Sequence, residues 1–182
     1  KNIMVSNGYM STDTFEALNG LIDAANFDLK SFSDSFYSNY CGARLKPVLN
    51  TIERALKNGW WVELTTLLIG GVNDSDSELD ELAAYIATTF GANVPWHVSR
   101  FRPAYKMMST PPTPVSSLER ALEAGYKHGL HYVYAGNIPG HEAESTFCPS
   151  CKTQVVYRCG FSTSPGFNGI CHNCGTAIAG VW

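Results

Sequence analysis

Five short apolar runs alternate with amphipathic segments over roughly the first 135 residues of this 182-residue chain, and this alternation restricts the fold more than any other feature. The runs are continuously apolar, which is typical of strands buried on both faces of a sheet. Short strands that alternate with helices predict βαβ units and a parallel sheet. We therefore expect an α/β fold with strands at residues 3–6, 24–29, 61–68, 96–101 and 132–135.

A helix is expected in each of the four intervals between these strands. Ser75 and Glu78 form a capping-box pattern that predicts the start of the third helix. Ser116 and Glu119 repeat that pattern before the fourth helix, which should stop at Gly129. The helices are expected to place one apolar face on the sheet.

Five strands are too few to close an eightfold barrel, which needs ~250 residues. We expect a partial (β/α) barrel or an open sheet, and either leaves an apolar edge strand at residues 3–6. The chain opens with Lys1 and runs at once into this strand. We therefore expect it to be a fragment of a longer protein.

The charge balance argues against a general nucleic-acid partner. The net charge is −3, from 13 basic and 16 acidic side chains, and no block of Lys and Arg is present. No apolar run approaches the ~18 residues needed to cross a bilayer, and no leader pattern opens the chain. We expect a cytoplasmic protein without a membrane partner.

Two C-x-x-C pairs, Cys148 with Cys151 and Cys171 with Cys174, are separated by 19 residues, which is the spacing of a zinc ribbon. Each pair offers two thiolates, and two pairs form a tetrahedral site of four sulfurs. So short a segment cannot bury enough surface to fold without a metal. We expect residues 1–140 to form the barrel part and residues 141–182 a four-cysteine zinc-ribbon module. Iron also suits four thiolates, and disulfides are the alternative.

Other reactive residues have weaker cases. Cys41 and Cys159 stand alone, and we expect each to be a small buried hydrophobe. His97 lies early in its strand and is expected in the core. His141 and Glu142 lie on a loop beside the ribbon, where a functional and a structural role are equally open.

In parallel βα architectures the carboxyl ends of the strands form the working face. Asp28 and Lys30 lie there, two residues apart, so their side chains project to the same side. Burying such charges is unfavourable unless they meet a partner or a ligand. A structural ion pair and a ligand site both remain open.

Two further polar pairs follow later strands. Arg100 and Arg102 share a strand face and could clamp a carboxylate, although solvated rim arginines are equally common. Asn73 and Asp74 follow the third strand, and we expect them to cap the next helix.

An ordered series of motifs extends over nearly the whole chain. It comprises Asn7-Gly8, Asp28-Leu29-Lys30, Cys41-Gly42, the run at 65–74, His97-Val98-Ser99-Arg100-Phe101, Tyr105-Lys106-Met107, the proline-rich run at 111–114, the Gly-Asn-Ile-Pro-Gly-His-Glu loop at 136–142, both C-x-x-C pairs and the final Gly180-Val181-Trp182. This series resembles the carboxyl-terminal two thirds of radical S-adenosylmethionine (SAM) enzymes related to pyruvate formate-lyase activating enzyme, in particular the AmmeMemoRadiSam-system type.

The resemblance implies a partial (β/α)6 barrel with a 4Fe-4S cluster on a C-x3-C-x2-C loop. In this family SAM is cleaved to methionine and a 5′-deoxyadenosyl radical, which abstracts hydrogen, in activating enzymes from a glycine of a partner protein. The resemblance implies that Asp28 and Lys30 contact SAM and that Asn7 faces it. Arg102 falls where activating enzymes often have a histidine, and Arg100 joins it as a candidate cofactor-binding residue.

No C-x3-C-x2-C motif and no Gly-Gly-Glu motif occur in the 182 residues. We therefore expect no catalytic residue here, no radical formation by this chain alone, and weak or no binding of SAM. SAM and a protein substrate are the expected partners of the parent protein. The alternatives are a noncatalytic α/β scaffold that binds protein or nucleic acid through its ribbon and, more remotely, a lyase with Lys30 as a Schiff base.

Overall fold

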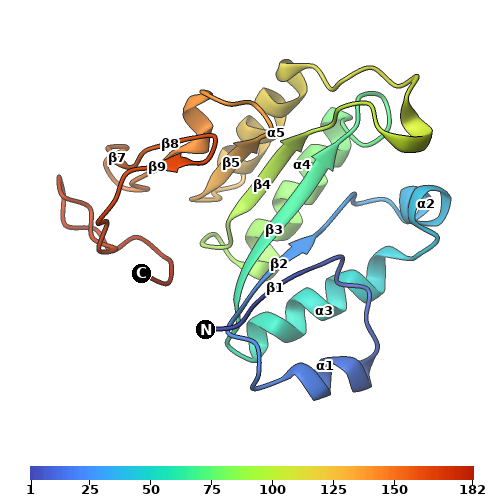
Figure 1. Ribbon diagram of the computed structural model, residues 1–182, viewed down its shortest axis with the longest axis horizontal. Coiled ribbons are helices and arrows are strands. Elements are labelled where there is room, and N and C mark those ends of the chain that lie inside the picture. The colour runs from blue at the N-terminus through green and yellow to red at the C-terminus, as the bar shows by residue number, and fades with distance from the viewer.

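The computed structural model describes residues 1–182 and contains a five-stranded, all-parallel sheet (Figure 1). The strands are β1 (Ile3–Ser6), β2 (Ala24–Asp28), β3 (Trp61–Leu68), β4 (Trp96–Arg100) and β5 (Val133–Gly136). They lie side by side in sequence order, so each pairs only with its neighbours along the chain. The expected α/β class is confirmed, and the strand bounds differ from the expected ones by no more than one residue.

Five α-helices accompany the sheet. They are α1 (Thr12–Leu18), α2 (Asp34–Phe36), α3 (Leu45–Lys57), α4 (Asp76–Tyr85) and α5 (Val115–Lys127). Helix α2 continues as a π-helix, Tyr37–Cys41, and α4 continues as another, Ile86–Phe90. The α2 segment was not expected from the sequence, because it carries serine, asparagine and aromatic residues without an apolar period.

The two predicted capping boxes have different outcomes. The hydroxyl of Ser75 accepts the backbone N–H of Glu78 at 3.3 Å, so the expected start of α4 is confirmed. The second box is wrong. Helix α5 begins immediately after Pro114, whose φ is −58°, so Ser116 already lies in the first helical turn and cannot cap it.

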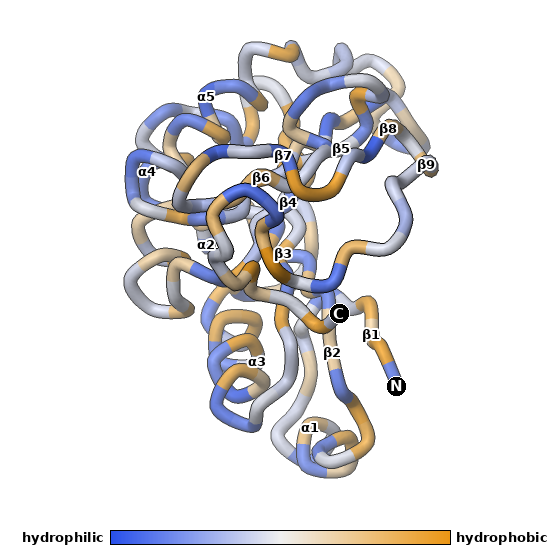
Figure 2. Tube along the Cα trace, turned by 90° about the vertical axis from the view of Figure 1, so that its left-hand side faces the viewer, coloured by the Kyte–Doolittle hydropathy of each residue, from blue (hydrophilic) through white to orange (hydrophobic).

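The two faces of the sheet differ in burial. Along β2, β3 and β4, alternate side chains are buried in a core of 32 residues shared with the helices. The other side chains are partly exposed, and we call this side the open face. At the sheet edge, Ile3 and Val5 of β1 are 72% and 77% exposed. Figure 2 shows the hydrophobic colour of β1 at this edge. The apolar edge expected from the sequence is therefore present.

Residues 141–182 include two small antiparallel sheets beside β5 (Figure 1). They contain a short 3-10 turn, Glu142–Glu144, followed by β6 (Thr146–Phe147), β7 (Gln154–Val156), β8 (Arg158–Cys159) and β9 (Ser162–Thr163). Their small core includes Tyr132 from the start of the β5 region, whose hydroxyl accepts the N–H of Ala179 at 3.0 Å. We call residues 141–182 the ribbon. No helix in the chain is long and apolar enough to cross a membrane.

Candidate cofactor edge and metal centre

The loop that follows β2 is fixed by hydrogen bonds at each successive residue. The Thr66 hydroxyl donates to the carbonyl of Leu29 at 2.7 Å. The N–H of Lys30 donates to the hydroxyl of Tyr37 at 3.1 Å, and its carbonyl accepts from Asn73 Nδ2 at 2.7 Å. Further along, Glu78 accepts both the Ser31 hydroxyl and the N–H of Phe32. The backbone around Lys30 is therefore held from β3, from the α2 segment and from α4.

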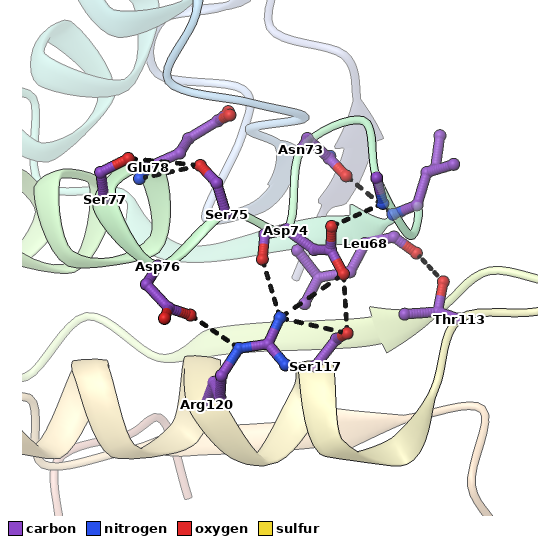
Figure 3. Close-up of polar contacts among 12 residues, drawn as sticks. Leu68, Asn73, Asp74, Ser75, Asp76, Ser77, Glu78, Thr113, Ser117 and Arg120 are labelled. Carbon is purple, nitrogen blue, oxygen red and sulfur yellow. Dashed lines mark hydrogen bonds and ion pairs between the residues drawn. The ribbon is translucent and has the colours of Figure 1, made fainter.

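Asn73 links this loop to the turn after β3. Its side chain is buried, with 1% exposed, and Oδ1 accepts the N–H of Ile69 at 2.7 Å (Figure 3). Nδ2 also donates to the Leu67 carbonyl at 3.0 Å. The expectation that Asn73 caps a helix is wrong, because Ser75 performs that role. Asn73 instead bonds one backbone N–H and two backbone carbonyls, which lie in the loop after β2, at the end of β3 and just beyond it. An amide is suited to this role because it both accepts and donates.

Asp74 is not a helix cap either. Its Oδ1 accepts the N–H of Gly71 at 2.7 Å, and its Oδ2 accepts the Ser117 hydroxyl at 2.7 Å (Figure 3). Arg120 donates to the Asp74 carbonyl at 2.9 Å and pairs with Asp76 at 2.7 Å. This cluster fixes the turn after β3 against α5.

Asp28 and Lys30 form an ion pair at the carboxyl edge of the sheet, with 2.9 Å between Oδ2 and Nζ. The two side chains are 35% and 37% exposed, so both charges remain accessible to a ligand. The backbone of Lys30 is fixed by hydrogen bonds, whereas the two charged side chains are in contact with solvent. A carboxylate and an ammonium held in this way can bind a zwitterionic or hydroxylated ligand.

The other predicted cofactor residues lie along the same edge. Asn7 is exposed one residue beyond β1, and its Oδ1 accepts the N–H of Tyr9 at 3.0 Å. Arg100 is the last residue of β4, and its Nε donates to the carbonyl of Thr113 at 2.6 Å. Arg102 is exposed in the loop beyond β4.

The structure does not bring Arg100 and Arg102 together on one strand face, because β4 ends at Arg100. Arg100 lies two residues after the buried Val98 in β4, so its side chain projects from the same, helix-covered face of the sheet. The cofactor role of these residues stays a prediction.

The four ribbon cysteines meet as the sequence predicts. Their sulfur atoms all lie within 4.8 Å of one another, with 3.6 Å from Cys148 to Cys174 and from Cys151 to Cys171. A tetrahedral zinc site with bonds of about 2.3 Å has sulfur–sulfur edges of about 3.8 Å. The donor set therefore fits a four-coordinate metal ion, which it would hold through thiolates alone.

The two cysteine pairs have the same local geometry. The N–H of Lys152 donates to the carbonyl of Cys148, and the N–H of Gly175 donates to that of Cys171, both at 2.9 Å. Lys152 and Gly175 have φ of 61° and 74°, in the left-handed region. Each turn thus returns the chain so that both sulfurs of a pair face the same point.

The thiols differ in their readiness to ionise. Hydrogen bonds from the side chains of Asn173 and Thr153 lower the pKa of Cys151 to about 5. Burial raises the pKa of Cys171 to about 11. A bound cation must therefore displace the proton of Cys171, which couples metal binding to pH.

The two remaining cysteines and His141 lie outside the four-cysteine site. Cys41 is exposed at the end of its π-helix, so the expectation of a buried hydrophobe is wrong there; Cys159 is half-buried. His141 Nδ1 accepts the N–H of Ala143 at 3.1 Å, so this histidine caps the turn that contains Glu142.

Sequence reasoning missed one polar cluster on the open face. Glu63 Oε2 lies 2.7 Å from His97 Nε2, and its Oε1 accepts the Trp61 indole N–H at 3.0 Å. The His97 ring stacks on Tyr134, with 5.0 Å between centroids. His97 is half-buried on this face and does not lie in the helix-covered core. A glutamate between apolar strand residues was the available signal, but its partner could be found only from the strand register.

The electrostatics of this pair favour the carboxylate. Burial opposes ionisation of Glu63, but the hydrogen bond and the positive field of His97 outweigh it, together with the Trp61 N–H and Arg158. The pKa of Glu63 is therefore held below its ordinary value.

Comparisons with known proteins identify the fold. No family model matches the chain. A protein of Methanocaldococcus jannaschii, described as uncharacterized protein MJ0808, is 42% identical over 157 residues, which cover 86% of this chain and 46% of that protein. The chain therefore spans less than half the length of this relative.

Two solved structures are similar in fold. A domain of pyruvate-formate lyase-activating enzyme from Bacteroides vulgatus superposes with a TM-score of 0.62 at 16% identity, covering 75% of this chain and 81% of that one. A radical SAM methyltransferase from Sphaerobacter thermophilus gives 0.59 at 17% identity, covering 72% and 39%. The parallel sheet and its helices thus form the α/β fold found in radical SAM proteins.

Proposed function

We propose that this chain supplies the later strands and the ribbon of a radical SAM enzyme related to pyruvate formate-lyase activating enzyme. The observation that carries the proposal is the fixed loop that presents Asp28 and Lys30 at the carboxyl edge of a radical SAM fold. The strand and loop positions of this pair agree with the motif resemblance described above. The parent activity is SAM cleavage followed by hydrogen abstraction, with a protein glycine as the proposed donor.

The chemistry of the pair suits SAM. SAM carries a carboxylate and an ammonium on its methionine part and two hydroxyls on its ribose. The Lys30 ammonium can bind a carboxylate or a hydroxyl, and the Asp28 carboxylate can accept from an ammonium or a hydroxyl. Because the Lys30 backbone is held on both its N–H and its carbonyl, the pair is positioned before a ligand arrives.

We propose zinc as the metal of the ribbon and a structural role for it. Four thiolates close the coordination sphere and leave no position for a substrate. The ribbon cysteines are also separate from Asp28 and Lys30, since the ribbon packs at Tyr132, before β5, and the pair lies at the carboxyl end of β2. The 4Fe-4S cluster of the parent enzyme would be held by residues outside this chain.

The test uses the full-length natural protein, purified and assayed without oxygen. We expect a brown protein that converts SAM to 5′-deoxyadenosine when reduced, and Lys30→Ala should weaken SAM binding by about tenfold, as expected for the loss of one charge-assisted contact. Lys46→Ala, which removes an exposed lysine of α3, is the matched control. A parent protein that forms no 5′-deoxyadenosine, or equal SAM affinity in both variants, would contradict the proposal.

One observation favours the second candidate, a noncatalytic scaffold that binds protein through its ribbon. Phe161, in the turn between β8 and β9, is fully exposed, which is uncommon for so large an apolar side chain. SAM cleavage by the parent protein separates the two candidates, because a scaffold would give none.

A further inference from the structure

A cavity of about 660 Å³ lies between the open face of the sheet and the ribbon. Its walls include Trp61 and Pro95, at the amino ends of β3 and β4, and Arg158 and Trp182 from the ribbon. Asp28 and Lys30 lie at the opposite, carboxyl end of the strands and do not line it. Its size falls within the range of small-molecule sites, which are mostly apolar with a few convergent polar groups.

The carboxylates that line this cavity already have donors from the protein. Glu63 accepts from the Trp61 indole and is paired with His97. Glu144 accepts the backbone N–H of Gly140 at 2.7 Å and that of Gly160 at 3.2 Å. The third acid, Asp23 at the rim, is paired with Lys1 at 3.0 Å. Each of these carboxylates therefore already has a hydrogen-bond donor within the protein, and Asp23 also has a cationic partner.

The guanidinium of Arg158 is not matched in the same way. Its Nη1 donates to the Thr146 hydroxyl at 2.6 Å and to the Glu144 carbonyl at 3.4 Å, and both acceptors are neutral. One face lies over the ring of Tyr134, with 5.6 Å from Cζ to the centroid. It takes part in none of the ion pairs of the molecule, although Glu63 lies within its field. The half-buried guanidinium thus keeps donors and positive charge for an anionic group.

The other walls indicate the shape of the ligand. Four aromatic residues line the cavity, which favours a planar ring; they are Trp61, Tyr132, Tyr134 and Trp182. His97 Nε2 lies 2.7 Å from the Glu63 carboxylate, and in the neutral form of the ring that donates from Nε2 to Glu63 the Nδ1 atom is a hydrogen-bond acceptor. A ligand donor group can therefore be received on the sheet side of the cavity.

We propose that this cavity binds a small aromatic carboxylate that carries an adjacent hydrogen-bond donor. The carboxylate pairs with Arg158, the ring packs against the aromatic walls, and the donor group reaches Nδ1 of His97. Half of this site comes from the sheet and half from the ribbon. The proposal concerns binding alone and does not depend on SAM chemistry at the other end of the strands.

Anthranilate is a suitable probe, because it combines an aromatic ring, a carboxylate and a neighbouring amine. Titration calorimetry on the metal-loaded 182-residue chain, without SAM, should give saturable binding of one anthranilate per chain. Aniline lacks the carboxylate and cyclohexanecarboxylate lacks the planar ring, and each should bind at least about tenfold more weakly. Absence of saturable anthranilate binding, or equal affinity for aniline, would overturn the proposal without reference to any variant.

Variants place the binding in the cavity. Arg158→Gln should weaken anthranilate binding by about tenfold or more, whereas Arg44→Gln, which removes an exposed arginine before α3, should leave it unchanged. Metal content and far-ultraviolet circular dichroism check that the ribbon remains folded. Should Arg158→Gln lose its metal, His97→Gln serves as the second variant, because His97 belongs to the sheet. Equal anthranilate affinity in His97→Gln, Arg44→Gln and the original chain would refute the assignment.

Discussion

At the scale of single residues, the buried amide of Asn73 helps to position the loop that carries Lys30. It satisfies the N–H of Ile69 and the carbonyls of Lys30 and Leu67. We expect Asn73→Ala to lower the free energy of unfolding by about 2–4 kcal/mol, because the buried N–H of Ile69 and two part-buried carbonyls lose their partner. Urea denaturation measures this change.

Asn50→Ala is the matched control, since Asn50 is exposed on α3 and should change the stability by less than about 0.5 kcal/mol. Asn73→Asp adds a sharper comparison. Aspartate can accept from Ile69 but cannot donate to the two carbonyls, so it should also be destabilising. A stability equal to that of the original chain in both Asn73 variants would mean that the two loops are held by other contacts.

Glu63 provides a pH-dependent contribution to stability. Its pKa is lowered in the folded state, so its ionised form stabilises the fold above the ordinary carboxyl pKa, and this contribution is lost as the pH falls through the lower, folded-state pKa. Glu63→Gln should therefore be less stable than the original chain at about pH 6, by about 1 kcal/mol, and the difference should shrink toward about pH 3.

Urea denaturation of both chains from about pH 3 to about pH 7 measures this difference. Effects of acid on the cysteine site are common to both chains and cancel. A difference that stays constant across the range would show that the carboxylate charge of Glu63 does not contribute.

Single residues also show what the sequence could reveal. Asp28 and Lys30 could be predicted as a pair from their separation of two residues, but β2 ends at Asp28, and hydrogen bonds of the following loop position Lys30. Glu63 and His97 are 34 residues apart, and only the pairing of Thr65 with His97 brings their side chains together. The exposure of Cys41 depends on a π-helix that no local pattern indicated.

At the scale of secondary-structure elements, α5 packs unusually close to the sheet at Gly125. A Cβ atom at this position would lie 2.7 Å from Cγ2 of Val133 and 3.4 Å from Cε3 of Trp96. Glycine to alanine normally stabilises a helix interior by up to about 1 kcal/mol. Here we expect Gly125→Ala to destabilise the chain by about 1–3 kcal/mol, because the stiff, buried valine cannot move away.

A double variant tests the cause of this effect. Val133→Ala removes the atoms that collide, so Gly125→Ala should be far less damaging in that background than in the original chain. Thermal unfolding of the four chains provides the comparison. Additive effects of the two substitutions would exclude the close contact as the cause.

The strands of the sheet could be predicted from the sequence, whereas the start of α5 and the segment at 34–41 could not. The five strands were predicted from their continuous apolar runs. The expected burial on both faces is wrong, because β2, β3 and β4 bury alternate residues and leave the open face partly exposed. The starts of α4 and α5 both carried a capping pattern, but the position of Pro114 decided where α5 begins. The segment at 34–41 is held by tertiary contacts such as the bond from the Lys30 N–H to Tyr37, which a local reading cannot detect.

At the scale of the whole molecule, the ribbon has a small core of its own, in which Cys148 and Cys171 are buried with Val155, Val156 and Ile178. We expect about one zinc ion per chain, and its removal by a chelator should unfold residues 141–182 while the sheet remains folded. Limited proteolysis with and without chelator should therefore release a stable fragment of roughly 140 residues, the boundary expected from the sequence.

Cys148→Ser should reproduce the effect of the chelator, and Cys41→Ser, at an exposed single cysteine, should not. Unfolding the ribbon also removes Arg158 and Trp182 from the cavity, so anthranilate binding should disappear with the metal. An unchanged digestion pattern after complete metal removal would contradict this account.

The order of the strands in the sheet has a consequence for biosynthesis. Because β1 to β5 lie side by side in the order in which the ribosome makes them, each new strand finds its neighbour already in place, at translation rates of about 5–20 residues per second. The ribbon follows β5 along the chain, and its residues Arg158 and Trp182 form part of the cavity wall. On the proposals made above, the cavity is completed only after the ribbon has been synthesised and has bound the proposed metal, so a nascent chain would not bind the proposed ligand early.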